Sequence, residues 1–375
     1  MVHKFVRKSI CFLTHDLMMG GIENVLIEAV NTLHTNYQIR IVCLYGEFQQ
    51  VVIDSFPEDV EVEFKNMPRT KWLRLPFMTR NYFKKALGNQ HYDYIIALKS
   101  FERHACYCKK DSRFIYWCFN DFHGLYMAKQ LTKQQKQTLS QDRKLYKHID
   151  AVWTVTSGIA EESNTLYKTN IFQPLPLSID CSAIAQKAEL PCDTKFDNTK
   201  TNLVLLGRIS PEKGFTRILQ KMPSLSRDFP NIHLHVIGGG DSLPQLRKKC
   251  ADKGLESYIT FWDAQPNPFP LLKQGQLFIC PSHFESFGLV MMEAMFLGIP
   301  LITTATTGGK YVTQNGTCAK CVDNTDEALY AAVRSFLQNP GSYNYSLERA
   351  KQWALSHDKI YFAERLQKLL EDVKH

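Results

Sequence analysis

The chain has 375 residues, of which 44% are hydrophobic and 22% are charged, so it can bury a sizeable core and is not intrinsically disordered. Basic residues exceed acidic ones by 45 − 37 = 8, too mild and too even an excess to indicate a nucleic-acid-binding protein. The first residues, MVHKFVRK, lack an apolar core and a cleavage site, so no secretory signal is expected there. The eleven scattered cysteines are expected to be reduced thiols in a cytoplasm.

Short apolar runs alternate with helix-like segments through most of the chain. In the first half we predict strands at 9–14, 39–45, 92–98, 114–117 and 151–155, a helix at 22–33, and a helix capped by Ser157. In the second half we predict strands at 202–206, 231–237, 277–280 and 299–303, and helices at 212–222, 289–297, 325–337, 347–353 and 360–373. Unbroken apolar strands joined by helices indicate parallel sheets covered on both faces.

The alternation lapses between about residues 172 and 200, where Pro174, Pro176 and Pro191 stand among charged residues. This composition is typical of a domain boundary. We therefore predict an α/β fold of two Rossmann-like domains facing a cleft. No G-x-G-x-x-G follows any predicted strand, which disfavours a nicotinamide-dependent dehydrogenase.

The most informative segment, SHFESFGLVMMEA, follows the predicted strand at 277–280 and opens the helix at 289–297. It places Glu285 in the loop and Glu293 on the second turn of the helix. Backbone amides at a helix N-terminus attract an anion such as a diphosphate, and carboxylates accept hydrogen bonds from sugar hydroxyls. The pair suits a ligand with a central diphosphate and sugars on both sides. A helix cap at Glu285 and a core ion pair at Glu293 form the alternative, and spacing alone weighs the two evenly.

Two further segments follow predicted strands. GRISPEKG, residues 207–214, places Arg208 and Lys213 at the carboxyl edge of the second sheet, where open α/β sheets bind ligands. Two cations there would neutralise a diphosphate, whereas ordinary loop cations beside a helix start are the alternative. HDLMMGGIE, residues 15–23, joins the first strand to the first helix, and Gly20 and Gly21 would allow an anion or a sugar to approach the backbone closely.

Together these segments resemble the family-4 glycosyltransferases, retaining enzymes of the GT-B architecture, in particular those of bacterial surface-polysaccharide and lipopolysaccharide synthesis. The resemblance covers nearly the whole chain and rests on PSHFESFGLVMMEAMFLGIP, GRISPEKG and GGIE, which stand in the family's order and spacing. It implies an N-terminal acceptor-binding domain over 1–175 and a C-terminal domain for the nucleotide-sugar donor over 176–355. It further implies a C-terminal helix, 356–375, that packs on the N-terminal domain.

The resemblance also implies roles for side chains of the donor domain. Arg208 and Lys213 would hold the diphosphate of the donor. Glu285 would contact hydroxyls of the transferred sugar, and Glu293 would bind the ribose of the nucleotide. These four residues would make the C-terminal domain the donor-binding half.

Other implied contacts come from the backbone and from loops. Gly20 and Gly21 would line the junction of donor and acceptor, and Asp263 would lie against the base. Backbone amides of the loop and helix start would meet the phosphates and the sugar. The residues that carry these amides are Ser286, Phe287, Gly288 and Leu289.

One run departs from the family's pattern. Many bacterial members carry Trp-x-His-x-Asp in the N-terminal domain, with the histidine near the reacting sugar. Here the run is WCFNDFH, and Phe119 stands where that histidine is expected. Phenylalanine cannot hydrogen-bond a hydroxyl, so Asp121 and His123 are taken, with Glu285, as the candidate catalytic residues.

The implied activity is that of a hexosyltransferase that moves a sugar, with retained configuration, from a nucleotide-diphosphate sugar to a hydroxyl of a glycan or glycolipid in lipopolysaccharide or capsule synthesis. A UDP-sugar is expected rather than a GDP-sugar. The sequence contains no Asp-x-Asp, which favours a site without metal or other cofactor, where fixed cations and a helix terminus stabilise the leaving diphosphate. The family implies same-face attack rather than double displacement.

Residues Arg69 to Lys85 carry six basic residues interleaved with apolar ones and no acid, which suits an anionic membrane surface or glycolipid. A core-facing helix with a solvated basic face is the alternative. We expect a cytoplasmic protein, peripheral at the inner face of the cytoplasmic membrane. Two other functions stay open: a GT-B sugar-nucleotide epimerase, and a non-catalytic sugar-nucleotide-binding partner subunit, the latter prompted by Phe119.

Overall fold

The computed structural model describes residues 7–69, 76–120, 132–192 and 194–373. The chain divides into two compact units. The N-terminal unit consists of residues 1–176 and 362–375, and the C-terminal unit consists of residues 177–361. The two units are described in turn.

The N-terminal unit is built on a seven-stranded sheet in the order β3-β2-β1-β4-β5-β6-β7, with every neighbouring pair parallel. The strands are β1 (Ser9–Thr14), β2 (Gln38–Cys43), β3 (Glu61–Phe64), β4 (Tyr94–Ala97), β5 (Arg113–Cys118), β6 (Ala151–Thr154) and β7 (Phe172–Pro174). The helices are α1 (Gly21–Leu33), α2 (Gln50–Ile53), α3 (Pro76–Leu87), α4 (Lys133–Tyr146), α5 (Ser157–Tyr167) and the short 3-10 helix η1 (Glu102–Cys108). The central strands are buried because helices cover both faces of the sheet.

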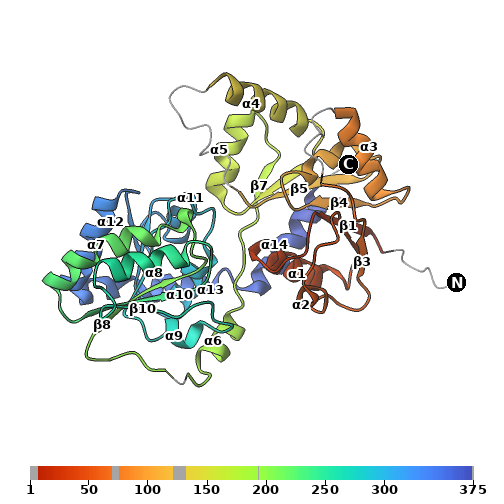
Figure 1. Ribbon diagram of the computed structural model, residues 1–375. Helices are drawn as coiled ribbons and strands as arrows, with labels where there is room; N and C mark the ends of the chain where they lie inside the picture. The colour runs from red at the N-terminus through yellow and green to blue at the C-terminus, as the bar shows by residue number, and fades with distance from the viewer. Residues whose placement is uncertain (1–6, 70–75, 121–131, 193, 374–375) are drawn as a thin grey trace. The chain divides into compact units, whose positions relative to one another are not determined.

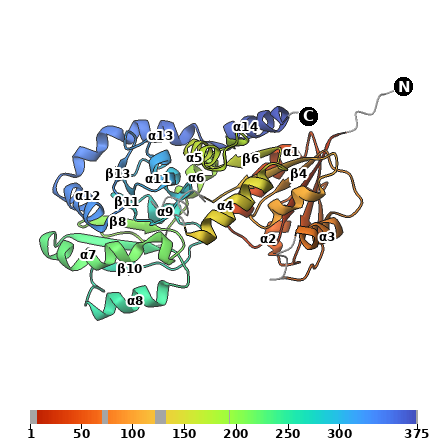
Figure 2. The same cartoon turned by 90° about the horizontal axis from the view of Figure 1, so that it is seen from above.

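The last helix of the chain, α14 (Lys359–Asp372), completes the N-terminal unit from Phe362 onward. Its buried side chains, Phe362, Leu366 and Leu370, recur at the spacing of one helix face. The ring of Phe362 lies 6.1 Å from that of Trp117 on β5, nearly parallel to it at 17°. Figure 2 shows α14 on the same side of the sheet as α1 and away from α3. The final helix therefore packs on the N-terminal unit, as the resemblance implied.

The C-terminal unit holds a six-stranded sheet in the order β10-β9-β8-β11-β12-β13, again with all neighbours parallel. The strands are β8 (Thr201–Leu206), β9 (Ile232–Ile237), β10 (Ile259–Phe261), β11 (Leu277–Cys280), β12 (Leu301–Thr304) and β13 (Lys320–Val322). The helices are α6 (Cys181–Ala188), α7 (Phe215–Asp228), α8 (Leu243–Asp252), α9 (Phe269–Leu272), α10 (Leu289–Phe296), α11 (Thr307–Val312), α12 (Asp326–Gln338) and α13 (Leu347–Leu355), with 3-10 helices η3 (Pro211–Lys213) and η4 (Pro340–Ser346). In Figure 1, α7, α8 and α12 lie on one side of this sheet and α6 and α9 on the other.

In each sheet the order in which successive strands are added reverses beside the first strand of the unit. In the N-terminal unit β1 lies between β2 and β4, and in the C-terminal unit β8 lies between β9 and β11. The loops that leave two such parallel neighbours diverge to opposite faces and open a crevice at the carboxyl edge. The loops after β1 and β4, and those after β8 and β11, are therefore where each unit is expected to bind a ligand.

Two local predictions were wrong, the cap of α5 and the start of α7. Thr156, not Ser157, caps α5, because Thr156 still has an extended backbone and its hydroxyl accepts a hydrogen bond from the amide of Ile159 at 3.2 Å. The stretch 172–200 contains the boundary between the two units, after Pro176, and it also contains β7 at the sheet edge and α6.

The helix expected at 212–222 begins three residues later, at Phe215. Gly214 has a left-handed backbone (φ 66°), which ends the turn of η3 before α7 can start. The helix then continues through Pro223 to Asp228. The helix continues despite the proline because its apolar face, which includes Ile218 and Leu225, is buried.

Within the basic stretch 69–85, residues 70–75 lie outside the described residues. On the described part of α3, Arg80, Lys84 and Lys85 are exposed, whereas Tyr82 and Phe83 are buried. This pattern is that of a core-facing helix with a solvated basic face. None of the helices in the described parts of the chain is long and apolar enough to cross a membrane.

Candidate functional site

The two predicted loops of the C-terminal unit meet at the carboxyl edge of its sheet. Lys213, at the end of η3 after β8, places its Nζ 2.6 Å from Oε2 of Glu285 in the loop after β11. The two residues are 72 positions apart in the sequence. Their side chains are 24% and 11% exposed, so water reaches the pair but screens it incompletely. The structure thus brings together the predicted cation and the predicted carboxylate.

Two glycines allow this approach. A Cβ atom at Gly214 would lie 2.2 Å from the carbonyl oxygen of Pro281, and the residue has a φ of 66° that side chains rarely adopt. Gly288, the N-cap of α10, has a φ of 92°, and its Cβ would lie 2.2 Å from Cε of Met291. The backbones of the two loops can therefore come this close only with glycine at position 214, whereas at position 288 it is the positive φ that favours glycine.

A buried arginine, which the sequence patterns did not single out, anchors the loop after β11. Arg217 is 4% exposed, and its Nη1 donates to the carbonyl of Pro281 at 3.0 Å and to Oδ1 of Asn324 at 2.7 Å. Its Nε donates to Oδ1 of Asp326 at 2.6 Å. Asn324 in turn donates to the carbonyl of His283 at 3.0 Å. The one signal in the sequence is that Arg217 stands on the apolar face of a predicted helix.

The other predicted cation, Arg208, lies at the same edge but faces water. Its side chain is 71% exposed, and its Nη2 lies 3.1 Å from Oε1 of Glu212. An exposed ion pair of this kind contributes little to stability. Arg208 can therefore turn toward an anion at small cost.

Glu293 lies on α10 and is half-buried. Burial raises its pKa to about 7, and the positive charge of Lys187 opposes this rise in part. At neutral pH the group is consequently near its titration midpoint. Such a carboxyl group can accept or donate a hydrogen bond, as a ligand with hydroxyl groups requires.

The remaining predicted residues of this loop form the start of α10. Phe287 is 1% exposed, with its ring 5.5 Å from that of Tyr311 and 6.1 Å from that of His357, so it holds the turn from behind. Gly288 caps the helix and Leu289 is its first residue. The first amides of a helix have no intrahelical partner, so Leu289 and its neighbours present donors at this edge. Ser286 precedes them in the same loop.

Asp263 has a left-handed backbone (φ 49°) just after β10. Its carbonyl accepts a hydrogen bond from the amide of Gly238 at 2.9 Å, and its carboxylate lies 2.8 Å from Nη2 of Arg247. The side chain is 65% exposed. Asp263 therefore lies at the carboxyl edge, two strands away from β8, and its contact with a base stays a prediction.

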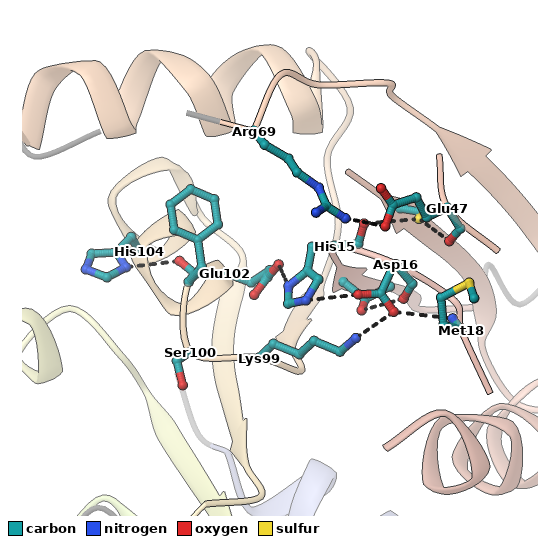
Figure 3. A network of polar contacts seen from close by, with 12 residues as sticks. His15, Asp16, Met18, Glu47, Arg69, Lys99, Ser100, Glu102 and His104 are labelled. Carbon is teal, nitrogen blue, oxygen red and sulfur yellow. Dashed lines mark hydrogen bonds and ion pairs between the residues drawn. The ribbon is translucent and has the colours of Figure 1, made fainter. Parts of the chain in front are cut away.

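The N-terminal unit has its own polar group at the edge between β1 and β4. Gly20 caps α1 and Gly21 is the first residue of that helix. Before them, the imidazole of His15 lies between the carboxylates of Asp16 and Glu102 (Figure 3). Lys99, which follows β4, contacts Asp16 at 3.0 Å. The sequence patterns did not identify Lys99 and Glu102, whose one signal is their position directly after a predicted strand.

Phe119 is 8% exposed, and its ring stacks on that of Trp117 at 5.3 Å. It is thus part of the core beneath the edge of β5. Asp121 and His123 lie outside the described residues. Among the described residues, no three His, Cys, Asp or Glu side chains are grouped so that they could hold a metal ion.

Part of the C-terminal unit matches a known protein family. Residues 186–353 match the family of glycosyl transferases group 1. The matched segment lies within the C-terminal unit and contains Arg208, Lys213, Glu285 and Glu293. The match supports the resemblance to glycosyltransferases inferred from the motifs.

A curated relative is itself named as a glycosyltransferase. The chain is 27% identical over 165 residues to the GDP-mannose-dependent alpha-(1-6)-phosphatidylinositol monomannoside mannosyltransferase of Mycolicibacterium smegmatis. That alignment covers 41% of this chain and 43% of the relative. The chain thus spans less than half the length of that relative, and it spans 37% of the glycogen synthase of Mycobacterium tuberculosis, to which it is 31% identical over 155 residues.

Solved structures match over nearly the full length. Alr3699/HepE of Anabaena, in complex with UDP and glucose, has a TM-score of 0.71 and 15% identity, covering 97% of this chain and 99% of that one. The lipopolysaccharide outer core galactosyltransferase WaaB has a TM-score of 0.72 and 16% identity, covering 96% and 99%. At such identities the similarity shows the fold, and it confirms the prediction of two Rossmann-like units of the GT-B class.

Proposed function

We propose that the chain is a retaining hexosyltransferase that moves a sugar from a nucleotide-diphosphate sugar to a hydroxyl of a glycan or glycolipid. The observation that carries this proposal is the contact between Lys213 and Glu285 beside the start of α10. A cation for a phosphate and a carboxylate for a sugar hydroxyl thereby adjoin one another at the edge where a doubly wound sheet binds ligands.

In this proposal the C-terminal unit binds the donor. Lys213 and Arg208 hold the diphosphate, together with the amides at the start of α10. Glu285, kept in place by Lys213, accepts hydrogen bonds from hydroxyls of the transferred sugar, and Glu293 binds the ribose. Since Lys213 and the amides at the start of α10 are already in position, they stabilise the charge that develops on the leaving diphosphate without rearrangement, whereas Arg208 turns toward it from water.

The proposed reaction keeps the configuration of the sugar by attack on the same face. The bond between the anomeric carbon and the diphosphate oxygen breaks, and a bond from that carbon to the acceptor oxygen forms. The proton of the acceptor hydroxyl goes to the departing phosphate. Lys213 and Arg208 supply the positive charge, so the proposal includes no metal or other cofactor.

Two features bear on the nucleotide and the acceptor. The fold is similar to that of Alr3699/HepE, whose structure contains UDP, which favours a UDP-sugar, whereas the mannosyltransferase of Mycolicibacterium smegmatis is named for GDP-mannose. Similarity to WaaB favours a role in lipopolysaccharide or capsule synthesis. We propose cytoplasmic activity with peripheral contact to an anionic membrane through the basic face of α3, which would contribute about 1 kcal/mol per basic residue.

Thermal unfolding with UDP-glucose, UDP-galactose, UDP-N-acetylglucosamine, GDP-mannose and the free nucleotides tests the proposal. A ligand at 100 times its Kd adds about 2.7 kcal/mol, which raises the unfolding midpoint by a few degrees. Lys213→Ala and Glu293→Ala should abolish that rise. Lys273→Ala, which removes an exposed lysine paired with Glu189, serves as the control and should keep it. Stabilisation by no nucleotide-sugar would contradict the donor site.

The buried position of Phe119 favours a second candidate, a non-catalytic sugar-nucleotide-binding partner subunit. Binding of a nucleotide-sugar without release of the nucleoside diphosphate, and no gain on Phe119→His, would support it. Product analysis on the same samples also distinguishes the epimerase, which would yield an isomer of the donor sugar without any acceptor.

A further inference from the structure

Five side chains at the edge between β1 and β4 form an unbroken line of polar contacts, and Figure 3 shows four of them, Glu102, His15, Asp16 and Lys99. Nδ1 of His15 lies 2.9 Å from Oε1 of Glu102, and Nε2 of His15 lies 3.0 Å from Oδ2 of Asp16. Nζ of Lys99 lies 3.0 Å from Oδ1 of Asp16 and 3.0 Å from Oε1 of Glu23. The five residues come from the loop after β1, the first turn of α1, and the loop and 3-10 helix after β4.

The two ends of this line are buried and its middle is accessible. The side chains of Glu102 and Glu23 are 0% and 7% exposed, whereas those of His15 and Asp16 are 30% and 17% exposed. Oε2 of Glu102 has no hydrogen-bond partner in the described part of the chain. Burying a carboxylate with one oxygen unsatisfied is costly, so the arrangement is not what packing alone would select.

The contacts limit what each group can do. Each ring nitrogen of His15 lies within hydrogen-bonding distance of a carboxylate oxygen, so the imidazole is held from both sides. Asp16 keeps a further lone pair after its contacts with His15, Lys99 and the amide of Met18. Although burial alone would raise it, the hydrogen bond and charge of Lys99 hold the pKa of Asp16 below its usual range. Asp16 is therefore an ionised, oriented and accessible hydrogen-bond acceptor.

The charges at this edge determine which ligand suits it. Among the described residues, the carboxylates are Asp16, Glu23, Glu47 and Glu102, and the permanent cations are Lys99 and Arg69. Lys99 is paired with Asp16 and Glu23, and Arg69 is paired with Glu47. A phosphate would meet excess negative charge and cations that are already paired, whereas a sugar hydroxyl would meet a ready acceptor.

We propose that this edge is the acceptor subsite of the N-terminal unit and that it takes an uncharged sugar or polyol rather than a phosphorylated group. Asp16 accepts the hydrogen bond from a hydroxyl of the acceptor. Glu102 is a positioning residue that acts through His15. This inference rests on the proposed function and names the class of acceptor group bound at this edge.

Saturation-transfer NMR on the full-length chain with saturating UDP tests the subsite. The probes are the methyl α-glycosides of glucose, galactose and mannose, compared with glucose 6-phosphate and inorganic phosphate. At least one neutral glycoside should bind fivefold or more tightly than either phosphate, and Asp16→Asn should weaken that binding at least fivefold. His34→Gln, which removes a partly exposed histidine paired with Asp59, is the matched control and should change nothing.

Stronger binding of a phosphate, binding of no glycoside while UDP binds, or unchanged binding in Asp16→Asn would each overturn the inference. Loss of UDP binding itself would instead contradict the proposed donor site, so the two failures are distinguishable. If Asp16→Asn does not fold, His15→Gln provides the same comparison, with an expected loss of about threefold.

The positioning role of Glu102 has a spectroscopic readout. Long-range ¹H–¹⁵N spectra report the environment of the two ring nitrogens of His15, which lie 2.9 Å from Glu102 and 3.0 Å from Asp16. Glu102→Gln should shift the ring-nitrogen resonances of His15 and weaken glycoside binding about threefold, with UDP binding retained. Unchanged ring-nitrogen resonances in Glu102→Gln would overturn this role.

Discussion

Nζ of Lys213 and Oε2 of Glu285 lie 2.6 Å apart, although each belongs to a different loop and a different βα unit. The contact exists because β8 and β11 are neighbours in the sheet while their following helices leave in different directions. It makes the cation that we assign to the diphosphate and the carboxylate that we assign to the sugar parts of one structural unit.

Loss of one partner should therefore cost more than loss of both. Lys213→Met leaves a half-buried carboxylate unpaired and should lower the free energy of unfolding by about 1–3 kcal/mol. The double variant Lys213→Met/Glu285→Gln should recover part of this loss, with a coupling of about 1 kcal/mol. Urea unfolding of the native chain, Lys213→Met, Glu285→Gln and the double variant, all without nucleotide, measures this double-mutant cycle. Strictly additive effects would show that the contact is absent in solution.

Gly214 should tolerate no side chain. Gly214→Ala combines a left-handed backbone with a Cβ atom 2.2 Å from the carbonyl oxygen of Pro281, and we expect a loss of about 2–4 kcal/mol in the free energy of unfolding. Gly158→Ala is the matched control, because it lies within α5 and its Cβ would meet nothing within 4 Å. It should be neutral or stabilise by up to about 1 kcal/mol. Equal effects of the two substitutions would argue against the loop approach described above.

Glu293 should destabilise the chain without ligand at neutral and higher pH. Burial raises its pKa to about 7, so the folded protein binds a proton more tightly than the unfolded chain does. The contribution of Glu293 to the free energy of unfolding is complete below about pH 4.5, falls as pH rises toward 7, and is lost above pH 7. Glu293→Gln should therefore raise the free energy of unfolding at pH 8 by about 1–3 kcal/mol, but not at pH 4.

The same substitution should abolish the stabilisation by nucleotide-sugar, because glutamine lacks the charge that we assign to ribose binding. Unfolding at both pH values, with and without ligand, separates the two effects. A variant that is less stable than the native chain at pH 8 would show that Glu293 is paired in the core instead.

His235 should make the C-terminal unit sensitive to acid. Trp262 donates to its Nδ1 at 3.1 Å, its Nε2 lies 2.9 Å from Oδ1 of Asn202, and the ring of Phe196 stacks on it at 3.5 Å. These contacts suit the neutral ring, and burial lowers the pKa of His235 to about 3. The contribution of His235 to the free energy of unfolding is complete above about pH 6.5. It is lost as pH falls toward 3, at about 1.4 kcal/mol per pH unit.

Urea unfolding at pH 7.5, 6 and 5 measures this slope. His235→Gln should be less stable at pH 7.5 but should lose less stability on acidification, so the two curves should converge. Parallel curves would assign the acid sensitivity to other groups.

Much of the fold follows from local patterns in the sequence. The apolar runs that become β1, β8 and β11 are unbroken because both faces of their sheets are covered, and they could be predicted without knowledge of any contact. The loops with Lys213 and Glu285 were expected at one edge because parallel strands place their carboxyl ends together. By contrast, β3, β7, β10 and β13 are the edge strands of the two sheets, and most of their residues are only partly buried, so no unbroken apolar run marks them.

Only the tertiary structure decided which side chains meet. The order of strands, which makes β8 the neighbour of β11 and β1 the neighbour of β4, depends on contacts between segments far apart in the chain. For that reason neither the buried clamp of Arg217 nor the line of contacts through His15 and Lys99 could be predicted. Residue type and spacing determined the chemistry available at each loop, whereas long-range packing determined which of those groups share an edge.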